Sequence, residues 1–385
     1  MKVCLLGLDN LPVLAPEYAQ CRIGGESVQQ TLLGRALVRA GHDVSMVVSD
    51  LGQRDGARWD GIRVYKAYRS DAGVPVLRFV HPRWTGLWSA LKRADADVYY
   101  TSCAGMEVGL LALFCRRFRR RFVFRAASDS DCDRSRVLVR YARDRWLYAQ
   151  GIKRADVILV QSASQARALA DSYGLASRVA GMFVEPPREP PKERDVDVLW
   201  VGNIRHVKRP DRLLALADGL PRLRFHMIGG PLPTERSLYT ETERDAALLG
   251  NVVLHGRLPY ADANAIYGRA KVLVSTSDIE GFPNAYLQAW IRGVPVVTFL
   301  DPDQVIESEG LGAAVHSLTD MRAAIEKLVE DPAAWSAASE RCLAYMQREF
   351  GEAGILADYL EAFEGAPGGE PDSTRVSRPE KAHHV

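Results

Sequence analysis

The sequence lacks the features that mark an exported, disulfide-bonded or membrane-spanning protein. Its six cysteines are scattered, with no Cys-x-x-Cys pair and no Cys/His cluster at metal-ligand spacing. They are expected to be reduced thiols. The apolar run at residues 3–8 is interrupted by Asp9 and Asn10 before a signal-peptide core can form. No stretch approaches the roughly 20 apolar residues that a bilayer-spanning helix needs. These absences predict a cytoplasmic protein.

A dinucleotide-binding fingerprint is also missing. Residues 7–12, which follow the first apolar run, read Gly-Leu-Asp-Asn-Leu-Pro instead of G-x-G-x-x-G. A nucleotide-dependent oxidoreductase or epimerase therefore remains only as the least supported class of function, favoured by the α/β pattern alone.

The chain has almost no excess of either charge, since its formal net charge is only +2. The positive charges are nevertheless distributed unevenly along the sequence. Residues 116–154 hold thirteen Arg and Lys against four Asp. A solvated helix surface explains such a run, and so does attraction to an anionic membrane or a phosphate-bearing acceptor. Residues 106–118 predict a core helix with a basic end. Peripheral contact of this helix with anionic lipid through Arg116 to Arg121, at the inner face of the cell membrane, is the alternative.

What the sequence does contain is an alternation of apolar strands and helical stretches. The chain of 385 residues exceeds what one hydrophobic core usually covers, so two domains are expected. Strand patterns occur at residues 2–8, 43–48, 98–101, 122–125, 157–160, 196–202, 224–228, 252–255, 272–275 and 294–299. Because most are apolar on both faces, they predict an α/β protein with two Rossmann-like, doubly wound parallel sheets.

The domain boundary is predicted from a charged, Pro-rich run at residues 185–194, which cannot supply sheet hydrogen bonds. The predicted division is an N-terminal domain (1–184), a linker (185–195), a C-terminal domain (196–345), a C-terminal helix packing back on the N-terminal domain (346–364) and a disordered tail (365–385).

The most informative segment runs from Ser275 to Val297, from a strand end through a loop into a helix. Pro283 suits the first turn of that helix, where backbone amides favour a phosphate. Gly281 allows close approach of a ligand to the backbone. Glu280 precedes this anion site, where a carboxylate is well placed only beside a group rich in hydroxyls, such as a sugar. Gln288 follows eight residues later on the same side.

A second segment, residues 199–214, carries a strand that ends at Gly202 and a helix that starts near Pro210. Ligands of open α/β sheets bind at the carboxyl ends of strands, so this loop is expected to face the same cleft as Glu280. Lys208 lies in the loop.

These two segments resemble the retaining glycosyltransferases of family 4, which have the GT-B fold of two Rossmann-like domains facing a central cleft. The resemblance implies that the domain at residues 1–184 binds the acceptor and the domain at residues 196–345 binds the nucleotide sugar. In their E-x7-E motif, the first acid contacts hydroxyls of the donor sugar and the second holds the ribose, which implies these roles for Glu280 and Gln288. The resemblance also implies that Lys208 binds the donor pyrophosphate. Where the family has an Arg, this chain has Asn203, so Arg205 or Arg209 would supply the second positive charge.

Weaker elements of the resemblance lie elsewhere in the chain. The turn at Gly229 resembles a family glycine turn, and the stretch around Leu258 resembles one whose backbone reads the base. In the N-terminal part, Gly24 and Gly25 resemble a loop that approaches the donor phosphates. Asp129 stands where relatives carry the Asp of a His-Asp pair beside the reacting sugar, although capping of the next helix explains it as well.

The candidate catalytic residues are therefore Glu280, Lys208 and Asp129. The candidate nucleotide-sugar-binding residues are Gly24, Gly25, Asn203, Arg205, Lys208, Gly229, Leu258, Glu280, Gly281, Phe282, Pro283, Asn284 and Gln288. No metal site is expected, because the D-x-D pattern at residues 129–131 and 301–303 is typical of a different fold.

The resemblance implies metal-independent, retaining transfer of a hexose-type sugar from a nucleoside-diphosphate sugar. The acceptor would be a saccharide or lipid-linked molecule of cell-surface polysaccharide or glycolipid biosynthesis, with no cofactor and no nucleic-acid partner. The neutral side chains of Asn203 and Gln288 leave a second hypothesis, a catalytically silent subunit that binds the nucleotide sugar.

Overall fold

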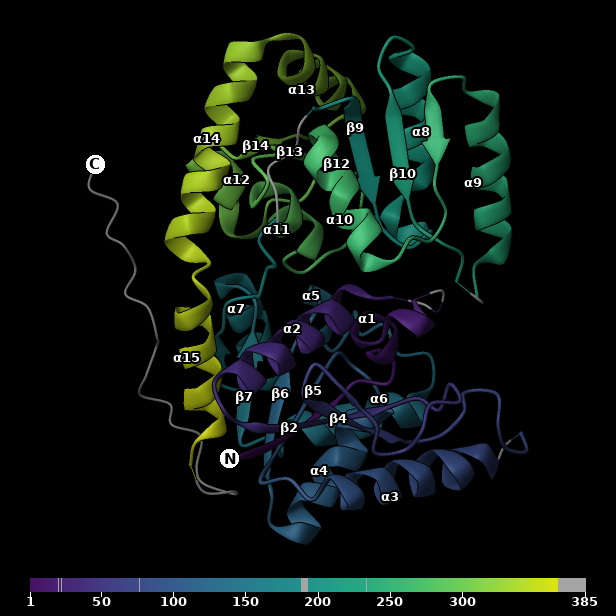
Figure 1. Cartoon of the computed structure of the whole chain (residues 1–385), viewed down its shortest axis with the longest axis vertical. Coiled ribbons are helices and arrows are strands. Elements are labelled where there is room, and N and C mark those ends of the chain that lie inside the picture. The colour runs from purple at the N-terminus through teal and green to yellow at the C-terminus, as the bar shows by residue number, and fades with distance from the viewer. Residues whose placement is uncertain (20, 22, 76, 188–192, 233, 366–385) are drawn as a thin grey trace. The chain divides into compact units, whose positions relative to one another are not determined.

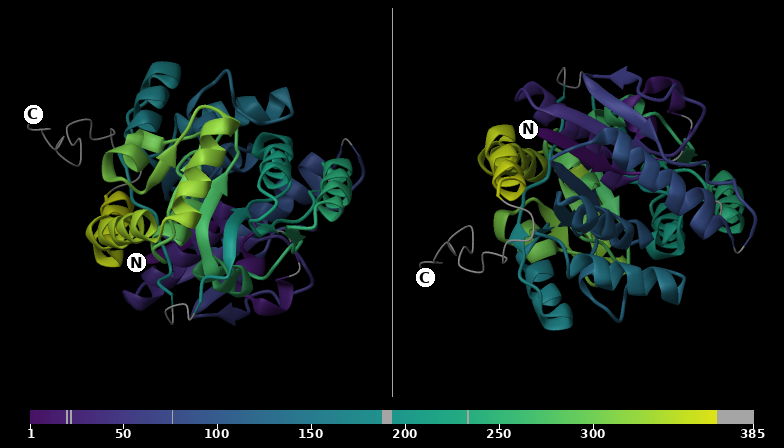
Figure 2. Two further views of the ribbon diagram at one scale, coloured as in Figure 1. Left: turned by 90° about the horizontal axis from the view of Figure 1, so that it is seen from above. Right: turned by 90° about the horizontal axis from the view of Figure 1, so that it is seen from below.

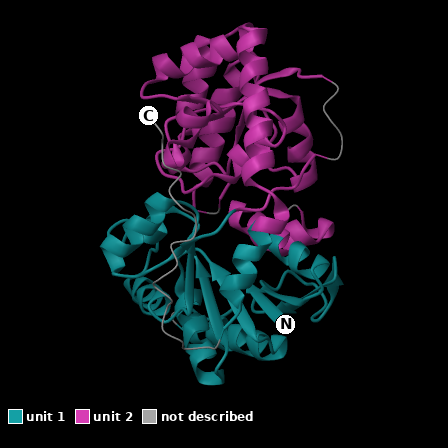
Figure 3. Cartoon of the chain, turned by 90° about the vertical axis from the view of Figure 1, so that its left-hand side faces the viewer, with its two compact units in different colours: residues 1–8, 33–181, 355–385 teal, residues 9–32, 182–354 magenta. Residues whose placement is uncertain are grey.

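The structure, a computed structural model, describes residues 1–19, 21, 23–75, 77–187, 193–232 and 234–365. The chain divides into two compact units (Figures 1 and 3). Unit 1 holds residues 1–8, 33–181 and 355–385, and unit 2 holds residues 9–32 and 182–354.

Unit 1 is built on a sheet whose described strands follow the order β3-β4-β2-β1-β5-β6-β7-β8. The strands are β1 (Lys2–Leu6), β2 (Asp43–Val48), β3 (Arg58–Trp59), β4 (Ile62–Lys66), β5 (Val98–Ser102), β6 (Arg121–Arg125), β7 (Val157–Val160) and β8 (Arg178–Val179). Every pair is parallel except β3 and β4, which are antiparallel. The strands are apolar on both faces, as helix-covered parallel sheets require.

Helices cover both faces of this sheet (Figures 1 and 2). They are the second half of α2 (Gly25–Arg39), α3 (Thr85–Ala94), α4 (Met106–Phe118), α5 (Asp129–Cys132), α6 (Ala142–Ile152), α7 (Ala163–Tyr173) and α15 (Glu352–Phe363), with the short helices η2 (Leu77–Phe79) and η3 (Val80–Trp84) before α3. One core cluster joins Cys4, Phe122 and Phe124 of the sheet to α3, α4 and α6.

Helix α15 belongs to unit 1 although it is the last helix among the residues that the structure describes. The ring of Tyr100, on β5, lies 6.1 Å from the ring of Tyr359 and 6.0 Å from the ring of Phe363. Arg121 of β6 donates from Nε to the carbonyl oxygen of Ala362 (3.0 Å). The helix therefore completes the cover of the central strands of unit 1.

Unit 2 has a wholly parallel sheet in the order β11-β10-β9-β12-β13-β14 among its described residues. The strands are β9 (Val196–Val201), β10 (Phe225–Ile228), β11 (Val252–Leu254), β12 (Ala270–Ser275), β13 (Val296–Thr298) and β14 (Gly312–Ala314). The order places β9 and β12 side by side at the centre, where the direction of winding reverses. Ligands of open α/β sheets bind at the carboxyl ends of strands at such a point.

Of the helical segments of unit 2, those that follow β9 form two layers on its sheet (Figures 1 and 2). The helical segments are α1 (Leu11–Leu14), η1 (Pro16–Tyr18), the first half of α2, η4 (His206–Lys208), α8 (Pro210–Gly219), α9 (Arg236–Leu248), α10 (Tyr260–Arg269), α11 (Asn284–Trp290), η5 (Pro302–Gln304), α12 (Val305–Glu309), α13 (Leu318–Glu330) and α14 (Pro332–Glu349). One core cluster joins the sheet to α10, α11 and α14, and another joins it to α8 and α13.

The predicted α/β architecture with two Rossmann-like parallel sheets is confirmed. The units nevertheless divide the chain differently from the predicted domains. Residues 9–32, assigned above to the N-terminal domain, belong to unit 2. Their contacts explain the difference: Asn203 Nδ2 donates to the Ile23 carbonyl oxygen (3.1 Å), and Gln29 bonds both Phe183 and Asn284. Helix α14 also continues past residue 345 within unit 2. Residues 188–192 of the predicted linker and 366–385 of the predicted tail lie outside the described residues.

Candidate functional site

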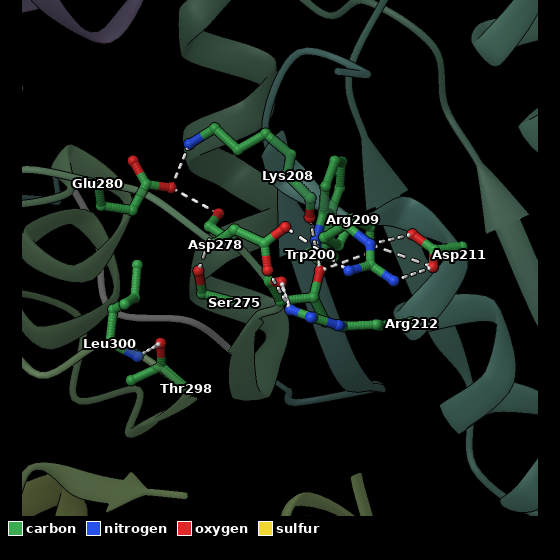
Figure 4. Close-up of polar contacts among 12 residues, drawn as sticks. Trp200, Lys208, Arg209, Asp211, Arg212, Ser275, Asp278, Glu280, Thr298 and Leu300 are labelled. Atoms are coloured by element: carbon green, nitrogen blue, oxygen red, sulfur yellow. Dashed lines mark hydrogen bonds and ion pairs between the residues drawn. The ribbon is translucent and has the colours of Figure 1, made fainter. Parts of the chain in front are cut away.

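The centre of the candidate site is an ion pair between Lys208 and Glu280. Lys208 ends the short helix η4 after β9, and Glu280 lies in the loop between β12 and α11. The Lys208 ammonium donates to Glu280 Oε1, and Figure 4 shows the two side chains pointing toward one another. Their side chains keep 22% and 14% of their exposure. Because β9 and β12 are adjacent parallel strands, their carboxyl ends bring these residues together, as the sequence predicts.

The loop that carries Glu280 is fixed by hydroxyl groups. Ser277 Oγ donates to Glu280 Oε1 (2.6 Å). Thr276 Oγ1 lies 2.7 Å from the carbonyl oxygen of Lys208, and Trp200 Nε1 donates to Thr276 Oγ1 (3.0 Å). Thr276 thus links the two loops that hold the ion pair. Ser277 is not among the residues predicted for the site. Its position three residues before Glu280 in the same loop could have indicated this contact.

Other charges near this corner are already paired (Figure 4). Arg209 Nη2 lies 2.7 Å from Asp211 Oδ2, and this carboxylate raises the pKa of the Arg209 guanidinium above its usual range. Arg212 Nη1 lies 2.7 Å from Asp278 Oδ1. Arg205 is held less closely, since its Nε lies 3.8 Å from Glu235 Oε1. Of the two arginines considered for the second positive charge, Arg205 is therefore the less engaged.

Two neutral residues of the predicted set are used to hold the segment at residues 23–29. Asn203 stands where the family has an Arg. Its Nδ2 donates a hydrogen bond to the Ile23 carbonyl oxygen. Asn284, the first residue of α11, accepts from Gln29 Nε2 (2.6 Å) and lies against Gly25. A Cβ added at Gly25 would come within 2.5 Å of Asn284 Nδ2, so a side chain at this position would displace the Asn284 carboxamide from its present place. The Gly24–Gly25 pair therefore lies within unit 2, beside the start of α11.

Gln288 is enclosed by hydrogen bonds. It is 4% exposed, its Nε2 donates to the Tyr260 hydroxyl (2.9 Å), and its Oε1 accepts from Arg292 Nη1 (2.8 Å). Arg292 is itself buried, and burial lowers the pKa of its guanidinium. Tyr260 and Arg292 carried no signal in the sequence, because neither belongs to a motif.

The remaining predicted nucleotide-sugar-binding residues also lie in unit 2. A Cβ at Gly229 would overlap the carbonyl oxygen of Gly202, so the β9 and β10 loops touch through their backbones. Leu258 and Phe282 are partly buried against the core cluster of α10, α11 and α14. Gly281 lies in the same loop as Glu280.

The predicted helix after Glu280 begins one position later than expected. Pro283 is the N-cap residue, with an extended backbone (φ −69°, ψ 126°), and α11 starts at Asn284. Proline cannot continue an extended strand hydrogen-bond ladder, and its fixed φ is compatible with the cap position as well as with the first turn.

Asp129 belongs to unit 1, where it opens α5. Its Oδ1 accepts from Gln165 Nε2 (3.0 Å). The capping role considered for it falls instead to Ser128 and Asp131, which form a capping box. A role of Asp129 in catalysis stays a prediction.

Helix α4 matches the core-helix alternative for residues 106–118. Most of its apolar side chains are buried in unit 1, and Leu113 is its exposed aliphatic residue. Arg120 pairs with Asp95 (2.7 Å), whereas Arg116, Arg117 and Arg119 are exposed.

No helix among the described residues combines the length and apolar character needed to cross a membrane. Within the same residues, no group of three or more His, Cys, Asp or Glu side chains is arranged to hold a metal ion.

A pocket of about 430 Å³ adjoins the ion pair at the carboxyl edge of the unit 2 sheet. Its polar lining includes Arg212, Ser277, Asp278 and His316, and Phe299 and Leu300 contribute apolar surface. Ser277 connects it to the site, because the same hydroxyl bonds Glu280.

Two family descriptions match the chain, one in each half. Residues 24–184 match "Glycosyl transferase 4-like domain", and residues 195–331 match "Glycosyl transferases group 1". The chain belongs to the GT-B glycosyltransferases of family 4. This membership confirms the resemblance on which the candidate residues were chosen.

Individual relatives of this family member are distant. The D-inositol 3-phosphate glycosyltransferase of Geodermatophilus obscurus is 31% identical over 174 residues, which cover 38% of this chain and only 39% of that protein. Sucrose-phosphate synthase of Thermosynechococcus elongatus has the same fold, with a TM-score of 0.73 at 18% identity over 94% of this chain and 98% of that one. Anabaena HepE in complex with UDP-glucose gives a TM-score of 0.69 at 14% identity over 94% of this chain and 100% of that one.

Proposed function

We propose that the protein is a retaining glycosyltransferase that transfers a hexose-type sugar from a nucleoside-diphosphate sugar. The observation that carries the proposal is the Lys208–Glu280 pair at the carboxyl ends of the two central strands of unit 2. A cation for the diphosphate and a carboxylate for the sugar hydroxyls lie in contact there, as the junction between phosphate and sugar requires. Anabaena HepE, which has the same fold, was solved with UDP-glucose, which supports a donor of this class.

The donor would exchange partners with this ion pair. The diphosphate would take over the Lys208 ammonium, while hydroxyls of the sugar would donate to Glu280 and replace the ammonium there. Ser277 would keep the carboxylate in place during the exchange, because its hydroxyl bonds the same Oε1. Each new hydrogen bond would keep one charged partner, so both residues would retain a bond of the stronger class when the donor is bound.

The reaction would proceed with retention at the anomeric carbon. The bond from that carbon to the diphosphate oxygen breaks, and a bond to the acceptor oxygen forms on the same face. The acceptor proton passes to the departing phosphate. Lys208, with Arg205 as the second cation, would stabilise the charge that develops on the leaving group. This scheme needs no metal or cofactor.

The acceptor would be a saccharide or a lipid-linked molecule in the biosynthesis of a cell-surface polysaccharide or glycolipid. Asp129 would act on the acceptor side. A cytoplasmic protein with a peripheral position at the inner face of the membrane suits a lipid-linked acceptor. Of the predicted basic contact, Arg116, Arg117 and Arg119 are available as exposed side chains for anionic lipid.

The proposal is tested by donor turnover after substitution of the ion pair. Glu280→Ala should nearly abolish transfer, and Lys208→Ala should lower kcat/KM at least tenfold, because both remove interactions with the donor at the reacting centre. The matched control is Lys271→Ala, which breaks another partly buried ion pair, with Asp197, at the opposite end of β12. Wild-type turnover by Glu280→Ala would exclude the proposed site.

A catalytically silent, nucleotide-sugar-binding subunit is the second candidate. The observation that favours it is the use of Asn203 and Gln288 in internal hydrogen bonds instead of in charged contacts with a donor. A thermal-shift panel with UDP, GDP, ADP and their sugars would identify the bound nucleotide, since ligand at 100 times its Kd adds about 2.7 kcal/mol of stability. Hydrolysis or transfer of the stabilising sugar nucleotide by purified protein would then exclude a silent subunit.

A further inference from the structure

Gln29 makes an unusually complete set of hydrogen bonds for a side chain outside every motif. It lies on α2, is 3% exposed and belongs to unit 2. Its Oε1 accepts from the Phe183 amide (2.8 Å), and its Nε2 donates to the Phe183 carbonyl oxygen (2.7 Å) and to Asn284 Oδ1 (2.6 Å). An amide group has two N–H donors and a carbonyl oxygen, so this side chain is fully engaged.

These bonds connect three segments that are far apart in the sequence. Gln29 and Asn284 are separated by 255 residues, and Gln29 and Phe183 by 154. Because Nε2 can only donate, Gln29 also sets which way the Asn284 carboxamide faces: Oδ1 lies toward Gln29 and Nδ2 lies against Gly25. The start of α11 and the start of α2 are thereby held together.

The contact lies next to the proposed donor site. Asn284 follows Glu280 by four residues, and Gly25 is half of the glycine pair predicted to approach the donor phosphates. Asn203 holds the same segment through its hydrogen bond to the Ile23 carbonyl oxygen. If Gln29 were removed, Asn284 would lose the partner that orients it, and the glycine pair would lose its connection to Phe183.

We propose that Gln29 is a positioning residue for donor binding, which acts by holding Asn284 against Gly25. The inference rests on the proposed function, because it assigns Gln29 to the same donor site. Gln29 would touch neither the reacting atoms nor the acceptor. Its loss should therefore weaken binding of the nucleotide and leave the rate of the chemical step nearly unchanged.

The test measures binding of UDP, GDP and ADP to the full chain by calorimetry, followed by KM and kcat for the corresponding sugar nucleotide. Gln29→Ala should raise the Kd of the nucleotide that binds and the KM of its sugar about tenfold, with kcat changed less than threefold. Gln29→Met, which keeps the side-chain length without the hydrogen bonds, should behave the same and guards against a folding defect caused by lost volume.

Gln30 provides the matched control. It is the next residue of the same helix, is 2% exposed and accepts a hydrogen bond from Asn10 Nδ2 (2.8 Å). Gln30→Ala should lower the unfolding temperature to a similar extent without changing the nucleotide Kd. Equal losses of affinity in the Gln29 and Gln30 variants would reduce Gln29 to a general structural role and overturn the proposal.

A double variant shows whether Gln29 acts through Asn284. The Gln29→Ala/Asn284→Ala protein should bind the nucleotide no more weakly than Asn284→Ala alone, because residues that act as one unit are not additive. Full additivity would overturn the proposed route. If the wild-type chain binds none of the three nucleotides, the proposed function itself fails. If it binds one and the Gln29 variants bind it equally well, only the role of Gln29 fails.

Discussion

At the scale of single residues, Gln288 departs from the acidic residue of the resembled motif, and its surroundings explain how a neutral amide is accommodated. The carboxamide nitrogen of Gln288 bonds the Tyr260 hydroxyl, and its carboxamide oxygen bonds the Arg292 guanidinium. The buried guanidinium of Arg292 depends on Gln288 for two acceptors, the side-chain oxygen and the backbone carbonyl at 2.9 Å. Gln288 therefore contributes to the stability of unit 2 whatever it contributes to a ligand.

Substitution of Gln288 separates these contributions. Gln288→Met should lower the free energy of unfolding by about 1 to 3 kcal/mol, since it leaves a buried donor of Arg292 without its side-chain acceptor. Gln288→Glu should be tolerated, because the carboxylate replaces a neutral acceptor by a charged one. Urea denaturation followed by tryptophan fluorescence measures both changes. A Gln288→Met protein as stable as the wild type would contradict the importance of this bond.

The buried carboxyl group of Asp131 should make the stability of unit 1 depend on pH. Burial raises the pKa of its carboxyl group to about 6, against which hydrogen bonds from the backbone amides of Ala127 and Ser128 act only in part. The favourable contribution of the protonated group is thus fully present below the unfolded pKa of 3.8 and is lost as the pH rises through about 6.

The Asp131→Asn variant removes this titration. As the pH falls from 7 to 4, the free energy of unfolding of the wild type should rise relative to that of the variant. The rise should be about 1 kcal/mol per pH unit at most. Chemical denaturation at several pH values provides the measurement. A difference that stays constant with pH would show that the carboxyl group keeps an ordinary pKa.

The centre of the candidate site was predictable from the sequence, whereas its supporting contacts were not. Lys208 and Glu280 each follow a buried strand pattern, and the carboxyl ends of parallel strands share one edge. The partners of Gln29 lie 154 and 255 residues away, and no periodicity or motif links such positions. The use of Asn203 to hold Ile23 is hidden for the same reason.

At the scale of elements, helices α4 and α6 cross at two glycines. A Cβ on Gly109 would come within 2.5 Å of the Leu147 carbonyl oxygen, and a Cβ on Gly151 within 2.7 Å of the Gly109 amide nitrogen. Backbone atoms of the other helix cannot give way as a side chain can. The absence of side chains at these positions therefore allows the two helices to approach closely.

Gly109→Ala should lower the free energy of unfolding by about 1 to 3 kcal/mol, which is typical of overpacking. The matched control is Gly354→Ala in α15, where no atom lies within 4 Å of the added Cβ. That substitution should raise stability by about 0.4 to 1 kcal/mol, because alanine loses less entropy in a helix. Thermal unfolding distinguishes the two, and a stabilised Gly109→Ala protein would contradict the close crossing.

Elements with clear apolar runs were predictable, and very short ones were not. The strands at residues 43–48 and 157–160 and the helix at residues 106–118 have the predicted bounds. The antiparallel β3–β4 pair and the strand β14 were missed. A strand of two or three residues, such as β3 or β14, is too short to show a period.

At the scale of the whole molecule, the division into units does not follow a single cut in the chain. The backbone passes from one unit to the other after residues 8, 32, 181 and 354. The predicted cut near residue 185 matched only one of these passages. The others depend on where residues 9–32 and helix α15 pack, which composition does not reveal.

Removal of α15 should destabilise unit 1 selectively. A chain that ends at Phe350 loses the buried side chains of Ile355, Tyr359 and Phe363, worth about 5 to 9 kcal/mol together at about 1.5 to 3 kcal/mol each. This is comparable to the total stability of a domain. Hydrogen exchange should show loss of protection in β5 and β6, with β9 and β12 still protected. A chain that ends at Gly365 keeps α15 and is the control, and equal protection in both chains would contradict the prediction.

The place of α15 also has a consequence for synthesis of the protein on the ribosome. All residues of unit 2 have been translated once residue 354 is reached, but most of helix α15, which covers the central strands of unit 1, then still has to be made. Domains usually fold in the order in which they are synthesised, beginning at the N-terminus. Here unit 2 would be complete before unit 1, although unit 1 contains β1, and the central strands of unit 1 would stay uncovered on one face until residues 355–363 have been translated.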